Sequence, residues 1–310
     1  MGMRVASCIV LAALAPAAGP AQAQVGACSA SDIIAITYAG TSLPPYNPFA
    51  LSAPKLMTVT VSATRTCALE LAFFSMSIPP RLTGVRSLNY DIQLPSAAAS
   101  LVYAGGTPAT TAHIDIGPGL IGSANVQISL PAGQVVGDGI YSDASVVSQI
   151  FDKSGAVLTL LKSANLPISG SVVRACQFMA PTSPTLNFTS AILNGLPRPG
   201  YVQSVTFQNV SCTAPSLVRL SGNAMLPAQP AGPTPTFDTL INYRASAMFS
   251  GANAMLDTSL GNDATSASRN TAVGAVTDGV VRVDVTLLAG KPLLPGTYSS
   301  ILTVSIDPNP

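Results

Sequence analysis

Charged residues are scarce in this chain of 310 residues, at 9% of the total against about 25% in ordinary soluble domains. There are 14 Lys and Arg and 13 Asp and Glu, with no basic run, so the clustered cations that a nucleic-acid binder needs are missing. Hydrophobic residues make up 48%, which excludes disorder, since disorder needs low hydrophobicity and high net charge. A single histidine excludes a multi-histidine metal site. The composition favours a secreted, β-rich, weakly charged protein.

The first 23 residues have the pattern of a secretory signal peptide. Arg4 supplies the positive start, and residues 5–15 form an apolar stretch too short for a bilayer, which needs about 20 residues. An A-x-A cleavage motif follows at residues 21–23. We therefore expect a mature, exported chain that begins at Gln24. The sequence before Cys28 also resembles a lipobox, so a lipid anchor on Cys28 is the alternative, disfavoured by the polar, proline-broken stretch before it.

Four cysteines remain after cleavage, an even number that predicts disulfides in an exported chain: Cys28, Cys67, Cys176 and Cys212. Spacings of 39 and 36 residues make the simplest pairing one bridge in each half of the chain. Each bridge would contribute about 3–4 kcal/mol by restricting the unfolded chain. A metal site built from the four cysteines is disfavoured because no C-x-x-C pair exists, and we expect neither a metal nor a cofactor.

The two halves of the chain repeat the same landmarks in the same order. The first cysteines of the two pairs are 148 residues apart and the second cysteines 145 apart. Leu-Asn-Tyr at 88–90 corresponds to Ile-Asn-Tyr at 241–243, and Gly-Ile-Tyr-Ser at 139–142 corresponds to Gly-Thr-Tyr-Ser at 296–299. An offset near 150 residues predicts tandem domains, which we place at residues 24–163 and 164–310.

Alternating apolar and polar residues, the period of a half-buried strand, recur in both halves. The clearest runs are residues 57–62, 202–210, 281–287 and 302–306. Turns with Pro and Gly separate them, and no segment sustains a helical period. The pattern predicts an all-β chain with two tandem immunoglobulin-like antiparallel β-sandwiches.

The two copies differ at their ends. The first copy continues from a strand at 144–151 through a turn to another apolar strand at 156–161, whereas the second copy has no counterpart after 302–306. With Leu302, Val304 and Ile306 facing inward, a sandwich without its last strand has an apolar groove and a free edge that recruits a strand from another chain. A smaller, complete sandwich is the alternative.

Only four mature residues would precede Cys28, too few for a strand of about five or six residues. The chain is thus expected to accept a strand and to have none to give. In a head-to-tail fibre, such a subunit occupies the terminal position.

The cysteine pairs, Asn-Tyr at 89–90 and 242–243, and above all the ending Leu-Pro-Gly-Thr-Tyr-Ser-Ser-Ile-Leu-Thr-Val at 294–304 resemble spore coat protein U domains. Such domains form the pilins of archaic chaperone–usher pili, and a two-domain member without a donor segment resembles their tip adhesin. The resemblance implies a periplasmic chaperone, an outer-membrane usher and an adjacent pilin that donates a strand. It also implies a pilus tip at the cell surface, with roles in adhesion and biofilm formation. The first copy departs from the pattern by an insertion at 134–138.

Two apolar loops of the first copy are candidates for contact with a hydrophobic surface or a host receptor. One holds Pro44, Pro45, Tyr46 and Phe49, and the other holds Leu120 and Ile121. Proline-stiffened loops lose little entropy on binding, and exposed apolar loop ends mark interaction sites. The alternative is that Tyr46 and Phe49 fold back into the core.

An enzyme is the contrasting class. Asp138 and Asp143 could imitate the carboxylate pair of a glycosidase, but both lie near turns, where Asp commonly bonds its own backbone. His113 and Asp115 share a strand face, but no nucleophile elbow accompanies them. We therefore expect no catalytic residues. A secreted coat or matrix protein that uses the same domains without a pilus is a third possibility, and neighbouring chaperone and usher genes would separate it from a pilin.

Overall fold

A computed structural model describes residues 26–153, 157–178, 183–229, 232, 234–261, 263–269 and 275–309. The signal peptide predicted for residues 1–23 lies outside the described residues. The described chain consists of β-strands, nearly all paired antiparallel, and three single-turn 3-10 helices, η1 (Ala30–Asp32), η2 (Thr189–Ala191) and η3 (Thr258–Leu260). The all-β antiparallel fold predicted from the sequence is confirmed.

The N-terminal unit contains three sheets, with strand orders β1-β2-β9-β6, β13-β10-β4-β5 and β12-β11-β3-β7, the last joined by β8 on β3. Its strands are β1 (Ile33–Ala39), β2 (Lys55–Ala63), β3 (Cys67–Phe74), β4 (Arg81–Thr83), β5 (Ser87–Asn89), β6 (Asp91–Gln93), β7 (Val102–Tyr103), β8 (Ala112–Ile116), β9 (Ile121–Ser129), β10 (Gly139–Asp143), β11 (Val147–Asp152), β12 (Thr159–Asn165) and β13 (Ile168–Val172).

The C-terminal unit has a five-stranded sheet, β14-β17-β23-β20-β21, and a three-stranded sheet, β22-β18-β25, with two small two-stranded pairs, β15-β16 and β19-β24. Its strands are β14 (Cys176–Phe178), β15 (Ile192–Leu193), β16 (Leu196–Pro197), β17 (Val202–Cys212), β18 (Ser216–Gly222), β19 (Leu226–Pro227), β20 (Tyr243–Phe249), β21 (Ala252–Asp257), β22 (Ala264–Arg269), β23 (Val276–Leu287), β24 (Tyr298–Ser299) and β25 (Leu302–Pro308).

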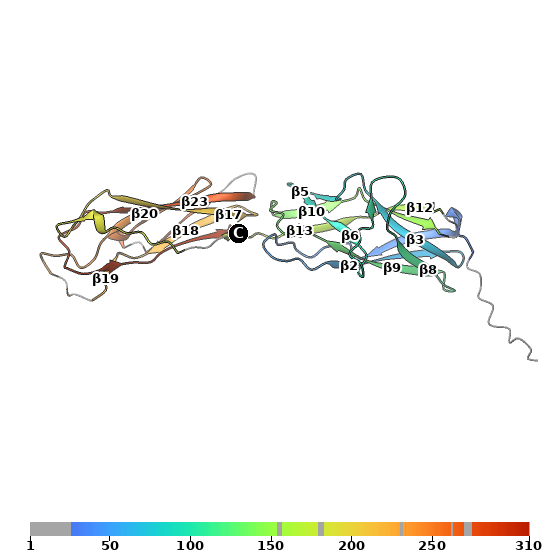
Figure 1. The fold of residues 1–310 in the computed structure, drawn as a ribbon, viewed down its shortest axis with the longest axis horizontal. Coiled ribbons are helices and arrows are strands. Elements are labelled where there is room, and N and C mark those ends of the chain that lie inside the picture. The colour runs from blue at the N-terminus through green and yellow to red at the C-terminus, as the bar shows by residue number, and fades with distance from the viewer. Residues whose placement is uncertain are drawn as a thin grey trace, which may run out of the picture.

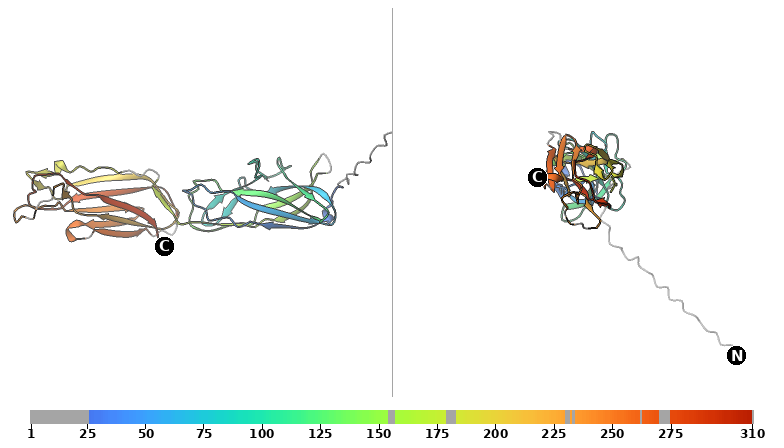
Figure 2. Two further views of the ribbon diagram at one scale, coloured as in Figure 1. Left: turned by 90° about the horizontal axis from the view of Figure 1, so that it is seen from below. Right: turned by 90° about the vertical axis from the view of Figure 1, so that its left-hand side faces the viewer.

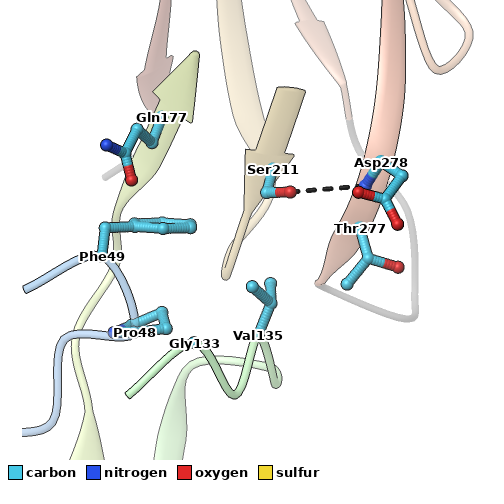
Figure 3. Close-up of a pocket in the computed structure, with 8 residues that line it drawn as sticks. All are labelled: Pro48, Phe49, Gly133, Val135, Gln177, Ser211, Thr277 and Asp278. Atoms are coloured by element: carbon cyan, nitrogen blue, oxygen red, sulfur yellow. Dashed lines mark hydrogen bonds between the residues drawn. The ribbon is translucent and has the colours of Figure 1, made fainter. Parts of the chain in front are cut away.

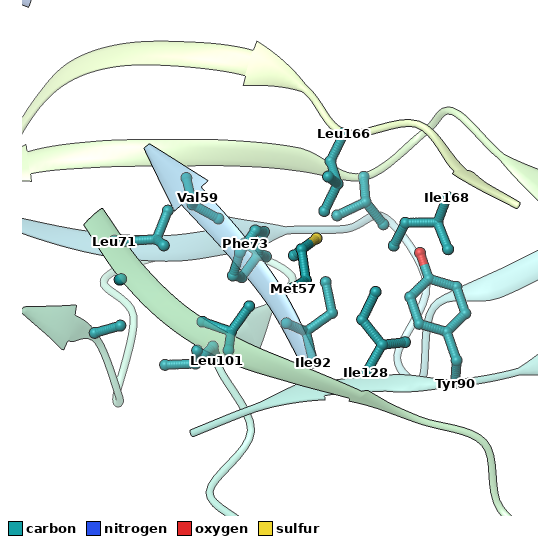
Figure 4. Close-up of a cluster of buried hydrophobic side chains, with 14 of the residues drawn as sticks. Met57, Val59, Leu71, Phe73, Tyr90, Ile92, Leu101, Ile128, Leu166 and Ile168 are labelled. Atoms are coloured by element: carbon teal, nitrogen blue, oxygen red, sulfur yellow. The ribbon is translucent and has the colours of Figure 1, made fainter. Parts of the chain in front are cut away.

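Each unit has its own hydrophobic core. The buried residues of the first core run from Cys28 to Val172, and those of the second from Ala191 to Ile306. In the first core, the inward residues of β2, β3 and β9 interdigitate, as Figure 4 shows for Met57, Phe73 and Ile128. Along β2 and β9, buried residues alternate with more exposed ones, which is the period-two pattern seen in the sequence of residues 57–62.

The structure moves the boundary between the units. The predicted boundary between residues 163 and 164 falls inside β12. The following strand, β13, pairs with β10 from Gly139↔Val172 to Asp143↔Ile168, so it belongs to the N-terminal unit. The first unit therefore extends to Val172, and the second begins at the disulfide cysteine of β14.

The two units lie end to end, and the last strand of the chain ends at their junction (Figures 1 and 2). Three contacts hold the junction: the Asp138 amide donates to the Thr213 carbonyl over 2.8 Å, and Arg174 Nε donates to Asp138 Oδ2 over 2.8 Å. Arg174 also donates to the carbonyl of Asn309 over 3.3 Å. The end of the N-terminal unit that carries Cys28 and Cys67 therefore lies farthest from the C-terminal unit.

Two disulfides link Cys28 to Cys67 and Cys176 to Cys212, the pairing predicted from the spacing. Because the sulfur of Cys28 is bonded to Cys67, no thiol is left there for a lipid anchor.

Separate cores predict separate responses to loss of a disulfide. We expect Cys176→Ser with Cys212→Ser to lower the unfolding free energy of the C-terminal unit by about 3–4 kcal/mol, the loop-closure value for a bridge of this length. The transition of the N-terminal unit should stay in place. Differential scanning calorimetry of the two transitions measures this, with Cys28→Ser/Cys67→Ser as the mirror-image control. Equal shifts of both transitions would mean that the units unfold as one.

Candidate functional site

The last strand of the C-terminal unit is hydrogen-bonded on one edge. β25 pairs with β18 along its whole length, from Ser216↔Pro308 to Gly222↔Leu302. Among the described residues, no strand pairs with the opposite edge of β25. Its outward-pointing N–H and C=O groups are thus available to another strand.

The facing sheet also has an incompletely paired edge. β17 pairs with β23 from Val202 to Cys212, and on its other edge the described strands pair residues 210–212, with the short strand β14. β14 lies beside β25. Within the described residues, an incompletely paired strand of each sheet therefore lies next to β14.

Several apolar side chains of the C-terminal unit pack against the second core but are only partly buried, among them Phe178, Leu186, Phe188, Val205, Phe207, Leu302 and Val304. The rings of Phe178 and Phe207 meet edge to face, with centroids 6.1 Å apart. The corresponding inward residues of β2 in the N-terminal unit, Met57, Val59 and Val61, are completely buried. Uncovered apolar area of this kind favours association with a further apolar strand.

The three residues predicted to face the groove do point toward the core. Ile306 is buried, Leu302 and Val304 are partly buried against the second core, and Thr303 between them is exposed. Burial increases toward the junction end of β25, so Leu302 and Val304 are the less buried of the three inward residues.

The N-terminal unit covers the equivalent edge with its own chain. β11 pairs with β3 on one side and with β12 on the other, and β10 pairs with β4 and β13. The hairpin predicted after residue 151 therefore exists, as β11 and β12. It completes the first unit in the way that the described part of the second unit does not.

The first predicted adhesive loop lies at the junction. Tyr46 is fully buried, its hydroxyl donates to the Pro131 carbonyl over 2.8 Å, and its amide donates to Ser171 over 2.7 Å. The prediction that Tyr46 contacts an outside surface is therefore wrong. The segment that holds Tyr46 runs alongside β13 like an additional edge strand, and its tyrosine side chain is buried. Pro44 and Pro45 are exposed beside it.

Phe49 lies in a cleft of about 380 Å³ between the two units. Figure 3 shows its ring directed into this cleft, across from Ser211, whose hydroxyl accepts from the Asp278 amide over 3.3 Å. Phe49 is half-buried and faces the C-terminal unit rather than the outside. Its place indicates a role in seating one unit on the other.

The second predicted loop lies at the far end of the molecule. Leu120 and Ile121 are 37% and 60% exposed, and Ile34 beside this end is 59% exposed. Ala63 donates its amide to the Leu120 carbonyl over 2.9 Å, which fixes the loop on β2. Leu120 has φ of 57°, a left-handed conformation that costs a non-glycine residue about 1–2 kcal/mol.

A charged cluster that sequence reasoning missed lies on β3 and β8. Glu70 is 2% exposed, and its Oε1 accepts from Lys153 Nζ over 2.8 Å and contacts His113 Nδ1 at 3.0 Å. Burial raises the pKa of Glu70, but the hydrogen bonds from Lys153, Thr111 and His113 outweigh burial and lower that pKa overall. The hydrogen bond to Glu70 raises the pKa of His113. The cluster forms because β3 and β8 pair with Glu70 opposite His113. This pairing joins two separate segments of the chain, so neither segment alone predicts the cluster.

The predicted contact of His113 with Asp115 exists, at 3.0 Å from Nε2 to Oδ1. The two aspartates considered for catalysis have separate partners. Asp138 pairs with Arg174, while Asp143 is buried and accepts from the hydroxyls of Tyr90 and Ser145. Within the described ranges, no group of three or more His, Cys, Asp or Glu side chains is placed to hold a metal ion. No helix in the described part of the chain is long and apolar enough to cross a membrane.

The Glu70–His113 pair predicts a pH-dependent stability of the N-terminal unit. Because folding raises the pKa of His113, its protonated form contributes stability below the ordinary value of 6.5, and this contribution is lost as pH rises through the folded pKa. Because the pKa of Glu70 is lowered, Glu70 keeps its charge until the pH falls below the ordinary value of 4.5. His113→Asn should therefore destabilise the unit at pH 5.5 and have little effect at pH 9. Urea unfolding across this range measures the difference, and a pH-independent difference would contradict the assignment.

No family model and no curated protein matches this chain. Among solved structures, it is similar to a chaperone–tip adhesion subunit complex from the archaic chaperone–usher Csu pili of Acinetobacter baumannii. The identity is 15%, the match covers 87% of this chain and 100% of that one, and the TM-score is 0.38.

It is also similar to the CupB6 tip adhesin from Pseudomonas aeruginosa, at 10% identity over 89% of this chain and 94% of that one, with a TM-score of 0.34. A third match is the CFA/I adhesin of enterotoxigenic E. coli, at 12% identity over 87% of this chain and 91% of that one, with a TM-score of 0.35. Likeness at this level assigns the chain neither to a family nor to a function.

Proposed function

We propose that the chain is the adhesive tip subunit of a surface pilus, held in the fibre by a strand that the adjacent pilin inserts into its C-terminal unit. The edge of β25 that no described strand pairs, together with the partly buried apolar side chains on the same unit, is the observation that supports the proposal. A strand with apolar residues at alternate positions would satisfy both the backbone edge and the side chains below it.

An exposed edge above apolar side chains is an aggregation hazard before assembly. A periplasmic chaperone that lends a strand would cover it during export, and an outer-membrane usher would then exchange that strand for the donor strand of the next subunit. The predicted signal peptide fits this route to the cell surface. The sparse charge also fits, since a subunit that remains in a fibre needs little independent solubility.

One feature supports the terminal position. The Cys28–Cys67 disulfide and β1 commit the chain from Cys28 onward to the N-terminal unit. The end carrying Leu120 and Ile121 then faces away from the fibre. There these side chains would contact hydrophobic surfaces and support adhesion and biofilm formation.

The strand-accepting groove is tested by filling it. A flexible linker and a strand with Val or Ile at alternate positions are added after Pro310. We expect the midpoint of thermal unfolding of the C-terminal unit to rise by at least about 5 °C, because the strand buries apolar area and pairs the free edge. The matched control carries the same strand with Asp at the alternate positions and should give no increase.

Val304→Asp places a charge under the inserted strand. It should abolish the rise in the unfolding midpoint that the added strand gives, since an unpaired charge is costly to bury. Thr303→Asp, on the exposed face of the same strand, should preserve most of it. If the unmodified chain is already monomeric and stable without a chaperone, and the added strand changes nothing, the groove does not accept a strand.

The adhesive role of the loop that holds Leu120 and Ile121 is tested by a substitution at Leu120. The substitution relieves the strain of the positive φ and removes the apolar side chain. Leu120→Gly should leave stability unchanged or raise it by up to about 1 kcal/mol, because glycine adopts positive φ readily. Combined with Ile121→Thr, it should reduce attachment of piliated cells to polystyrene. Leu51→Thr removes a side chain that is 93% exposed elsewhere and serves as the control. Undiminished attachment with normal piliation would exclude this loop as the adhesive contact.

A further inference from the structure

The N-terminal unit carries a second cleft, of about 330 Å³, on the outer face of the sheet β12-β11-β3-β7. It lies apart from the groove, the junction and the loop at Leu120. Aromatic and aliphatic side chains line it, together with one amide, two hydroxyls and a Gly-Gly turn: Phe74, Tyr103, Gly105, Gly106, Thr107, Pro108, Gln149, Phe151, Leu158 and Leu160. Its volume is at the small end of the range for ligand-binding clefts.

Strand register builds the aromatic wall. Along β3, Leu71 and Phe73 point into the core, so Phe74 points outward. β7 pairs with β3 in parallel and places Tyr103 opposite Phe74. The two rings meet edge to face, with centroids 5.7 Å apart and planes at 75°. Both residues are half-buried, so each contributes apolar surface to the cleft.

The polar side of the cleft comes from the neighbouring strand. β11 places Gln149 opposite Ala72, next to the aromatic pair. The Tyr103 hydroxyl donates to Gln149 Oε1. This bond orients the amide, and within the described residues no acceptor is found for the two hydrogens of Gln149 Nε2. The Tyr103 oxygen keeps its own acceptor capacity, and burial raises the pKa of Tyr103, so its hydroxyl stays protonated. Thr107 adds a further hydroxyl.

The lining contains no acidic or basic side chain. A phosphorylated, sulfated or carboxylated ligand would need a cationic partner, which the cleft does not offer. A wholly apolar ligand would leave the Gln149 amide hydrogens buried without an acceptor, at a cost in free energy. The lining instead matches a ligand with apolar C–H surface on one side and neutral hydroxyls on the other.

We propose that this cleft binds a neutral saccharide unit, with its C–H surface against Phe74 and Tyr103 and its hydroxyls bonded to the Gln149 amide and the Thr107 hydroxyl. Saccharide binding by the N-terminal unit does not depend on pilus assembly, whereas its use in adhesion rests on the function proposed above. The cleft then provides a specific contact beside the less selective contact of the apolar loop.

Gly105 offers a position at which a larger side chain would fill the cleft without disturbing the fold. A Cβ added at Gly105 meets no atom within 4 Å, and φ of Gly105 lies outside the left-handed range. Gly105→Trp is therefore expected to fold normally and to fill the cleft. Gln149→Leu removes the amide but keeps the volume of the side chain, and so tests the polar contact alone. Unchanged unfolding temperatures of both variants establish that the fold is intact.

The experiment measures binding of the purified full mature chain to an array of neutral mono- and oligosaccharides, with sialylated and phosphorylated glycans on the same array. We expect binding to a subset of the neutral glycans at micromolar to millimolar concentrations, at least ten-fold weaker with Gly105→Trp and with Gln149→Leu. Leu120→Gly should bind as the unmodified chain does.

Binding to no neutral glycan at millimolar concentration would overturn the proposal, as would a preference for charged glycans or binding that both cleft variants leave unchanged. The assay uses protein in solution and no pilus. Its failure is therefore distinguishable from a failure of the strand-acceptor groove, which shows in the response to an appended strand.

Discussion

An antiparallel strand has two hydrogen-bonding edges, and the way this chain covers them determines the difference between its two units. In the N-terminal unit, β10 and β11 have partners on both edges, because the chain turns back as β12 and β13. In the C-terminal unit, β25 has β18 on one edge and no described strand on the other. The same architecture thus gives one closed core and one core with a partly open side.

The end-to-end arrangement separates the candidate functions along the long axis of the molecule. The edge of β25 without a described partner lies in the C-terminal unit, whereas the loop that holds Leu120 and Ile121 is bonded to the end of β2 in the N-terminal unit. The junction between the units is held by Arg174, which contacts Asp138 of the N-terminal unit and the carbonyl of Asn309 just after β25. A strand inserted along β25 would therefore end close to the contact that joins the two units.

Local patterns predicted much of the fold. The period-two runs at 57–62, 202–210, 281–287 and 302–306 all lie within strands, because alternation directly encodes which side faces the core. The even cysteine count and the similar spacings of 39 and 36 residues predicted the disulfides. The boundary at residues 163 and 164 was misplaced because the small, polar residues of β13 do not reveal that it pairs with β10.

The candidate sites were harder to predict, because they depend on which distant segments meet. Pro44 and Pro45 suggested an exposed loop, but Tyr46 beside them bonds to Pro131, 85 residues further along the chain. The buried position of Glu70 follows from its pairing with His113 across two strands. The cleft of Phe74, Tyr103 and Gln149 likewise requires the register of three strands, which no local pattern contains.

Hydrogen–deuterium exchange along β25 tests the central claim most directly, since it reports which backbone amides are hydrogen-bonded. In the purified chain, the amides of residues 302–308 that point toward β18 should be protected and the alternate amides should exchange rapidly. Addition of a complementary strand should then protect the alternate amides as well. Full protection of both sets in the monomeric chain without any added strand would show that the edge is already covered, and would contradict the account.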